Sequence, residues 1–187
     1  MANFTQILKK NLSGLSDYVA LATVSPKNYK EANTQIIKFL VKESNMPGAY
    51  VTLNAPYPNV KKRLEDEKID TRMILFIDAV TKTSQGIERK DNCLLIGNPQ
   101  NLSDISVAMD QAVRSLPSSK RFVFFDSLST LLLYNNPPSV AQFIHFLSGR
   151  MHVWKVKGII ISLQNKKDQE LIDSLLPFCD TQINLED

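Results

Sequence analysis

The sequence predicts an α/β fold, with a mostly parallel central sheet flanked by helices. Apolar runs alternate with helical patterns along the chain, which is the signature of βαβ units. Several of these runs are apolar at nearly every position, as strands covered on both faces require. The 187 residues, 43% of them hydrophobic, are enough for one sizeable core. We therefore expect a single domain over residues 1–187, with an N-terminal helix in residues 1–16 and the α/β core in residues 17–187.

The first half of the chain alternates between strands and helices. The apolar run YVALATV predicts a buried strand at Tyr18–Val24. After the turn SPKN, apolar residues recur at helical spacing and predict a helix from about Tyr29 to Ser44. Strands are expected at Ala49–Leu53 and Met73–Ile77, separated by a charged helix from about Pro56 to Glu67.

The second half continues the alternation after a polar interruption. Residues 79–92 lack periodicity and predict a surface loop. A short strand is expected at Cys93–Ile96, and Ser103 is a candidate N-cap for a helix through Leu116. The remaining elements are a strand at Arg121–Phe125, a helix at Ser139–Val153, a strand at Gly158–Ser162, a helix at Asp168–Leu176 and a strand at Thr181–Leu185.

Composition argues against several classes of protein. The formal net charge is +3, and the basic residues form short, separated clusters. Nucleic-acid binding needs basic charge gathered on one face, so we do not expect it. Cys93 and Cys179 show no CxxC spacing and indicate reduced thiols in a cytoplasmic protein. No apolar run reaches the ~20 residues of a membrane span, so none is expected.

Residues that follow the strands are the first candidates for a functional site, because ligands of open α/β sheets bind beyond the carboxyl ends of the strands. These residues are Ser25, Asn54, Asp78, Asp126 and Ser162. Asp78 and Asp126 could meet as a carboxylate pair for Mg²⁺ or for acid–base work. Aspartate also commonly starts turns, so both interpretations stay open.

Two further features have ordinary explanations. His145 and His152 lie seven residues apart, whereas zinc sites built on one helix use four-residue spacing, so we expect packing or solvent exposure. The apolar run Leu131–Tyr134 would be costly to expose. We expect it to fill the core under the sheet edge or to lie at a subunit contact.

The segment FVFFDSLSTLLLY resembles the Walker B strand of the RecA/KaiC-like ATPases and the turn after it. The segments VTLNAPYPNVKKRLEDEKID and LLIGNPQNLSDISVAMDQAV are similar to the same family in their rhythm of strand, turn and helix. The resemblance covers roughly Val19 to Leu185 and is to the archaeal RecA-superfamily paralogues often associated with signal transduction. It implies a RecA-like P-loop NTPase core in which Asp126, with Ser127 beside it, occupies the position that holds Mg²⁺.

The phosphate-binding loop of that family does not survive in this sequence. Its pattern GxxxxGK[ST] supplies glycine backbone for the phosphates, a lysine and a metal-binding hydroxyl. A gapless placement after Ser25 puts Pro26 and Glu31 at the two glycines, Ala32 at the lysine and Asn33 at the hydroxyl. Proline removes a backbone donor. A glutamate at a helix N-terminus repels a phosphate where the helix dipole would hold one.

A second loss is independent of the first. In the KaiC-like branch the second strand typically ends in two glutamates that polarise the attacking water, and here Asn54 and Ala55 stand in that place. We expect a non-catalytic domain that acts as a regulatory or signalling module, binds a protein partner or a second copy of itself, and needs no cofactor. The alternative is a divergent ATPase that binds ATP and Mg²⁺ through Lys27 or Lys30 together with Asp126.

Overall fold

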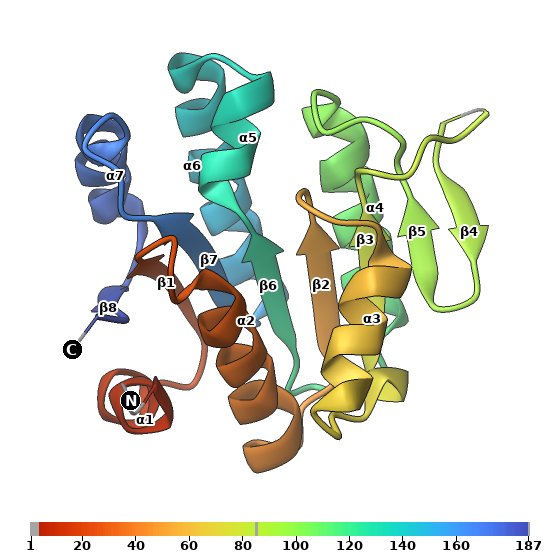
Figure 1. The fold of residues 1–187 in the computed structure, drawn as a ribbon, viewed down its shortest axis with the longest axis horizontal. Coiled ribbons are helices and arrows are strands. Elements are labelled where there is room, and N and C mark those ends of the chain that lie inside the picture. The colour runs from red at the N-terminus through yellow and green to blue at the C-terminus, as the bar shows by residue number, and fades with distance from the viewer. Residues whose placement is uncertain (1–3, 85, 187) are drawn as a thin grey trace.

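The computed structural model describes residues 4–84 and 86–186 and has three layers, a central sheet with helices on both faces (Figure 1). In the described chain, eight strands form one sheet in the order β4-β5-β3-β2-β6-β7-β1-β8. β4 pairs antiparallel with β5, and the other described pairings are parallel. The strands are β1 (Tyr18–Val24), β2 (Gly48–Thr52), β3 (Ile74–Asp78), β4 (Glu88–Lys90), β5 (Cys93–Leu95), β6 (Phe122–Asp126), β7 (Lys157–Leu163) and β8 (Thr181–Asn184).

The helices divide between the two faces of the sheet. One face is covered by α1 (Phe4–Leu12), α2 (Tyr29–Ile37) and α3 (Tyr57–Asp66). The other face is covered by α4 (Leu102–Ser115), α5 (Leu128–Tyr134), α6 (Pro137–Trp154) and α7 (Gln169–Leu175). A π-helical segment at Lys38–Glu43 prolongs α2, and short 3₁₀ turns lie at Thr71–Met73 and Leu176–Phe178.

Alternation along the strands produces two separate cores. In β1, Ala20 and Ala22 face α1, α2 and α3, in what we call the α2-side core. Val19 and Leu21 face the other helices, in the α6-side core. Every residue of β1 is buried, which is why this strand is apolar throughout instead of alternating.

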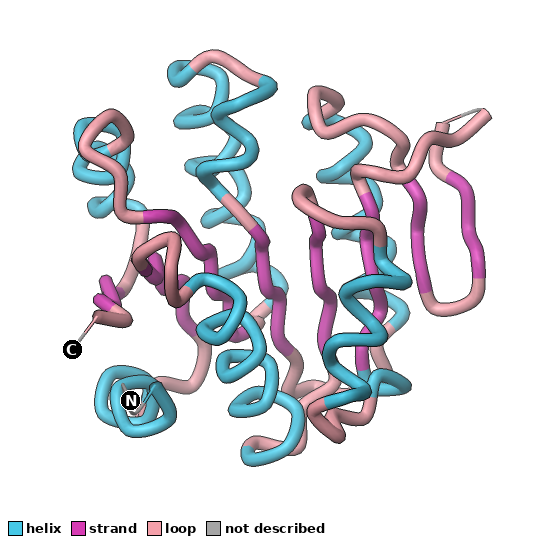
Figure 2. The backbone as a smooth tube through the Cα atoms, in the orientation of Figure 1, coloured by secondary structure: helices cyan, strands magenta, loops and turns pink. Residues whose placement is uncertain are grey.

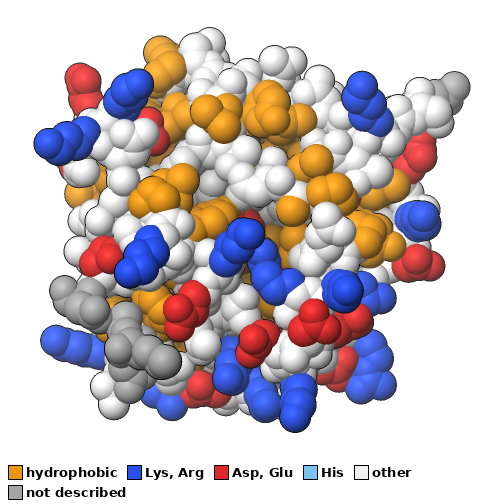
Figure 3. Space-filling view, viewed as in Figure 1, with side chains coloured by type: hydrophobic (Ala, Val, Ile, Leu, Met, Phe, Trp, Pro, Cys, Tyr) orange, Lys and Arg blue, Asp and Glu red, His pale blue; other side chains and the backbone are white. Residues whose placement is uncertain are grey.

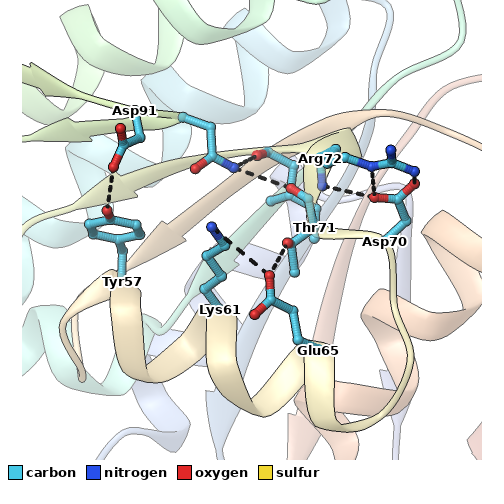
Figure 4. A network of polar contacts seen from close by, with 9 residues as sticks. Tyr57, Lys61, Glu65, Asp70, Thr71, Arg72 and Asp91 are labelled. Atoms are coloured by element: carbon cyan, nitrogen blue, oxygen red, sulfur yellow. Dashed lines mark hydrogen bonds and ion pairs between the residues drawn. The ribbon is translucent and has the colours of Figure 1, made fainter.

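α3 is fixed over the sheet by polar contacts that Figure 4 shows. The Tyr57 hydroxyl donates to Asp91 at 3.4 Å, and Thr71 donates to Glu65 at 2.8 Å. At the start of the helix, the Tyr57 backbone N–H donates to Asp78 at 2.9 Å. These contacts set the position of the loop between β2 and α3, which contains Asn54.

The predicted fold class is confirmed, and the elements fall close to their predicted places. β1 has the predicted bounds, and β2, β3, β6, β7 and β8 start or end within a residue or two of prediction. α1 lies inside the segment predicted as an N-terminal helix, and residues 1–3 of that segment are outside the described residues. The long helix starts at Pro137 rather than Ser139, because proline fits the first helical turn, whose N–H groups need no partner.

The expectation of a plain loop over residues 79–92 is wrong. Its end forms β4, which pairs with β5 at the edge of the sheet (Figure 2). The strand is three residues long, polar and mostly exposed, so it carries no apolar pattern. The helix predicted to start at Ser103 is capped instead by Asn101, whose side chain accepts from the Asp104 N–H at 3.1 Å.

The run Leu131–Tyr134 is part of a helix, α5, that was not predicted from the sequence. Leu131 is buried in the α6-side core, as expected. Leu133 is 80% exposed and Tyr134 is also exposed, so burial of the whole run is wrong. A helix turns successive residues to different sides, so α5 buries only part of its apolar run.

Candidate functional site

Asp126, the last residue of β6, lies at the centre of a network of polar side chains and is only 3% exposed. The Tyr50 hydroxyl and the Asn33 amide donate to its Oδ2 at 2.6 and 2.9 Å. The Asn54 amide donates to Oδ1 at 2.8 Å, and the Tyr29 hydroxyl donates to the same oxygen. A carboxylate has about four accepting positions. These four side chains therefore fill the accepting capacity of Asp126.

The fold brings these donors together from three places. Tyr29 and Asn33 lie one turn apart on α2, whose first turns cross the carboxyl end of β6. Tyr50 points into the α2-side core from β2, the strand beside β6. Asn54 follows β2 in the loop before α3. The carboxylate thus joins the first turns of α2 to the centre of the sheet.

Burial raises the pKa of the Asp126 carboxyl above its usual value, while hydrogen bonds from Tyr29 and Tyr50 and the nearby Arg63 guanidinium oppose the rise. Burial and the adjacent carboxylate also raise the pKa of Tyr50. Arg63, on α3, donates to the Tyr50 hydroxyl at 3.4 Å. A buried carboxylate is costly unless it is hydrogen-bonded and balanced by a cation, and this arrangement supplies both.

Ser127 and Thr130 extend the network toward the surface. The Asp126–Ser127 peptide bond is cis. Ser127 caps α5 by accepting from the Thr130 N–H at 3.2 Å, and the two hydroxyl oxygens are 3.0 Å apart. The Thr130 hydroxyl donates to the Asn54 amide oxygen. Asn54 is therefore held through both its oxygen and its nitrogen.

The turn after β1, where the resemblance places a phosphate loop, is closed on itself. The Asn28 N–H donates to the Ser25 carbonyl at 3.1 Å across the turn. The Ser25 N–H donates to the side-chain carboxylate of Glu186, and the Asn28 amide lies 3.5 Å from the other oxygen of that carboxylate. A hollow of about 670 Å³ lies beside this turn, lined by Thr23, Gln164, Gln182 and other residues, and Asp126 does not line it.

The other residues assigned to the former phosphate loop do not converge on one point. Pro26 and Lys27 are exposed in the turn, and Lys30 and Glu31 are exposed on the first turn of α2. Ala32 is fully buried and packs in the α2-side core. A longer side chain at position 32 would have to enter that core or displace the helix.

Asp78 does not join Asp126. Both pair with Thr52, from opposite sides of β2, and each has its own donors. Asp78 accepts from the N–H groups of Tyr57, Val80 and Thr81 and from the Thr81 hydroxyl. Among the described residues, no group of three or more histidine, cysteine, aspartate or glutamate side chains is arranged to hold a metal ion. The carboxylate pair considered from the sequence is therefore not formed.

The histidines also stay apart from this edge of the sheet. His145 stacks on Phe178 with the ring centroids 4.1 Å apart. His152 lies 3.6 Å from the Asp180 carboxylate.

Several residues of the site had not been singled out from the sequence, namely Tyr29, Tyr50, Arg63 and Glu186. Thr130 had been considered only within a cluster of hydroxyls, where nucleophilic catalysis was not expected. One available signal was Tyr50, because a tyrosine within a buried apolar strand needs a partner for its hydroxyl. The others are brought in by tertiary structure. Of the predicted residues, the structure gathers Asn33, Asn54, Asp126 and Ser127, and it leaves Ser25 in a separate contact with Glu186.

Comparison with known proteins places the chain in a family. Residues 49–185 match the family model described as a family of unknown function (DUF7504), which is most of the chain, and the chain belongs to that family. No curated protein sequence matches it. No helix of the described residues has the length and apolar character needed to cross a membrane.

Two solved structures from Pyrococcus horikoshii OT3 share the fold. One is titled a KaiC-like protein, PH0186, from hyperthermophilic archaea; it is 14% identical with a TM-score of 0.58 over 78% of this chain. This chain spans 61% of the length of that protein. The other, PH0250, is 16% identical with a TM-score of 0.64, over 98% of this chain and 88% of its own. At these identities the likeness shows a RecA/KaiC-like fold.

Proposed function

We propose that this chain is a RecA/KaiC-like domain that does not hydrolyse nucleotides and works as a regulatory or signalling module through protein contacts. The observation that carries the proposal is the Asp126 carboxylate, whose accepting positions are occupied by four side chains of the same chain. Magnesium prefers oxygen ligands in open octahedral geometry and keeps several waters. A metal ion would therefore have to displace at least one of these donors to reach the carboxylate.

The former phosphate loop supports the proposal independently. Three groups that hold a triphosphate in P-loop proteins have no counterpart in the gapless placement: the glycine backbone, the lysine and the metal-binding hydroxyl. Glu31 adds a negative charge on the first turn of α2. Asn54, at the place of the water-activating residue, is bound to Asp126 and Thr130 and has no basic atom. We therefore propose no catalytic residue and no cofactor.

The surface supports a role in protein binding. Large apolar side chains are exposed on α4, α5 and α6, which are adjacent helices on one face of the sheet and offer apolar surface to a partner. They are Val107, Leu133, Tyr134, Phe146 and Val153. Figure 3 shows hydrophobic side chains at the end of the molecule toward which β6 points. The partner in this proposal is another protein or a second copy of the chain.

The test is nucleotide binding to the intact protein. Titration calorimetry with ATP or GTP and Mg²⁺ should give dissociation constants of about millimolar or weaker, since each missing charged contact is worth about 1.5–3 kcal/mol. Asp126→Asn, which removes the negative charge that would attract Mg²⁺, is the matched control and should behave like the wild type. A micromolar constant that Asp126→Asn abolishes would overturn the proposal and favour an ATPase using Lys27 or Lys30.

A further inference from the structure

The turn between β1 and α2 holds a carboxylate that comes from 161 positions further along the chain. The Ser25 N–H donates to Oε1 of Glu186, and the Asn28 side-chain amide faces Oε2 at 3.5 Å. The two groups of the turn, the Ser25 N–H and the Asn28 amide, are donors, and the Glu186 carboxylate supplies the acceptors. The pairing has the chemistry of an anion site, in which a backbone N–H and an amide meet a negatively charged group.

The position of Glu186 is set by its neighbours. Leu185 is fully buried in the α2-side core, and its N–H donates to the Thr23 carbonyl at 2.8 Å, which continues the β1–β8 pairing. The Glu186 N–H donates to the Asn184 side chain at 3.0 Å. With the residue before it anchored and its own backbone fixed, Glu186 is directed to the end of β1.

The charges around the turn are two lysines and one glutamate, Glu31, whose negative charge partly offsets theirs. Lys27 lies in the turn and Lys30 on the first turn of α2, and both are exposed. Each adds positive potential that attracts a carboxylate or a phosphate, and solvent weakens this attraction without abolishing it. Ser25 also lies just past the end of β1, so its N–H pairs with no neighbouring strand and donates to Glu186 instead.

We propose that the β1–α2 turn is an anion site that the chain fills with its own Glu186 carboxylate, so that phosphate or another small anion enters only when this negative charge is removed. The proposal rests on the proposed function for the identification of this turn with the former phosphate loop. The proposed function says that the turn lacks phosphate-binding residues. This proposal adds that its remaining donors, the Ser25 N–H and the Asn28 amide, already face the Glu186 carboxylate.

The test is chemical rescue of the full chain. Glu186→Ala should have a lower Tm than the wild type in sodium chloride. Inorganic phosphate at equal ionic strength should raise the Tm of this variant by about 2–4 °C more than it raises that of the wild type. Glu67→Ala is the matched control, because Glu67 is an exposed glutamate at the end of α3, and it should respond as the wild type does.

A second measurement locates the effect. In ¹⁵N-correlated spectra, phosphate should shift the Ser25 amide resonance in Glu186→Ala and in Glu186→Gln but not in the wild type. The glutamine variant keeps the length of the side chain and removes only its charge, so it gives the same readout if the alanine variant does not fold. Equal responses to phosphate in variant and wild type overturn the proposal. Micromolar ATP binding by the wild type that leaves the Ser25 amide resonance unshifted would instead refute the proposed function alone.

Discussion

Asp78 and Asp126 are both aspartates at the carboxyl ends of inner strands, β3 and β6, but their carboxylates accept from different kinds of donors. β2 lies between their strands, and both pair with Thr52 in register. Both are buried, at 0% and 3% exposure. Asp78 accepts from two N–H groups of its own turn, from the Thr81 hydroxyl and from the Tyr57 N–H. Among the described residues, the Asp126 carboxylate accepts only from side chains that lie 72 to 97 positions away in the sequence.

The two sites differ in whether their hydrogen-bond donors can reorient and become acceptors. A backbone N–H has a fixed direction and cannot become an acceptor. A tyrosine hydroxyl rotates and can accept, and an asparagine amide can turn over to present its oxygen. Asn33 already has a buried amide oxygen with no hydrogen-bond partner among the described residues. The Asp78 site is therefore rigid and local, whereas the Asp126 site is adaptable and connects distant segments.

Alanine substitutions should give the largest effect. Asp126→Ala leaves four side-chain donors without an acceptor, two of which, Asn33 and Tyr50, are fully buried, and we expect it to lower the free energy of unfolding by about 3–5 kcal/mol. Asp78→Ala should cost less, about 2–3 kcal/mol, because water can reach the turn residues Val80 and Thr81. Urea denaturation of both variants measures this. A larger loss for Asp78→Ala would contradict the ranking.

Replacing each aspartate by asparagine should lower the free energy of unfolding less at position 126 than at position 78. In Asp126→Asn, the new NH₂ group can face Tyr50 and Asn33, which are able to turn and accept, so the loss should be no more than about 1 kcal/mol. In Asp78→Asn, the new NH₂ group must face at least one backbone N–H, and the loss should be about 1–3 kcal/mol. The same denaturation experiment decides it. Equal losses at the two positions would show that adaptable donors make no difference.

The fold could be predicted because its strands are buried on both faces. A run such as Tyr18–Val24 is apolar at every position but one and has few alternative structures. The elements that were missed lack such a signal. β4 is short, polar and at the edge, where strands are commonly charged. In α5, an apolar run that indicated core is divided between core and solvent by the helical turn.

The site could be predicted only in part. Strand ends pointed to Asn54 and Asp126, and the gapless placement singled out Asn33 as the residue at the metal-binding hydroxyl position. In the structure the Asn33 amide donates to Asp126 at 2.9 Å. Which tyrosine reaches a carboxylate 76 or 97 positions away depends on how α2 and β2 pack, and no local pattern in the sequence encodes that.

The smallest effect is expected in the pH dependence of stability, and it concerns Asp126 alone. Burial raises the pKa of this carboxyl in the folded protein, against the usual value of about 3.9 in the unfolded chain. Between the two values the folded state binds more protons than the unfolded state, so stability falls as pH rises. The stabilising contribution is complete below about pH 3.9 and is lost as pH rises through the folded-state pKa.

Asp126→Asn has no such proton, so the wild type should gain stability relative to this variant as pH falls from 7 toward 4. Burial and the adjacent Asp126 carboxylate raise the pKa of Tyr29 and of Tyr50 above the usual tyrosine value, so both tyrosines stay neutral over this range. Changes elsewhere in the protein are common to both and cancel in the difference. Urea unfolding of the pair at several pH values measures it. A difference that stays constant, or that shrinks as pH falls, would mean that the four donors outweigh burial and hold Asp126 ionised throughout the range.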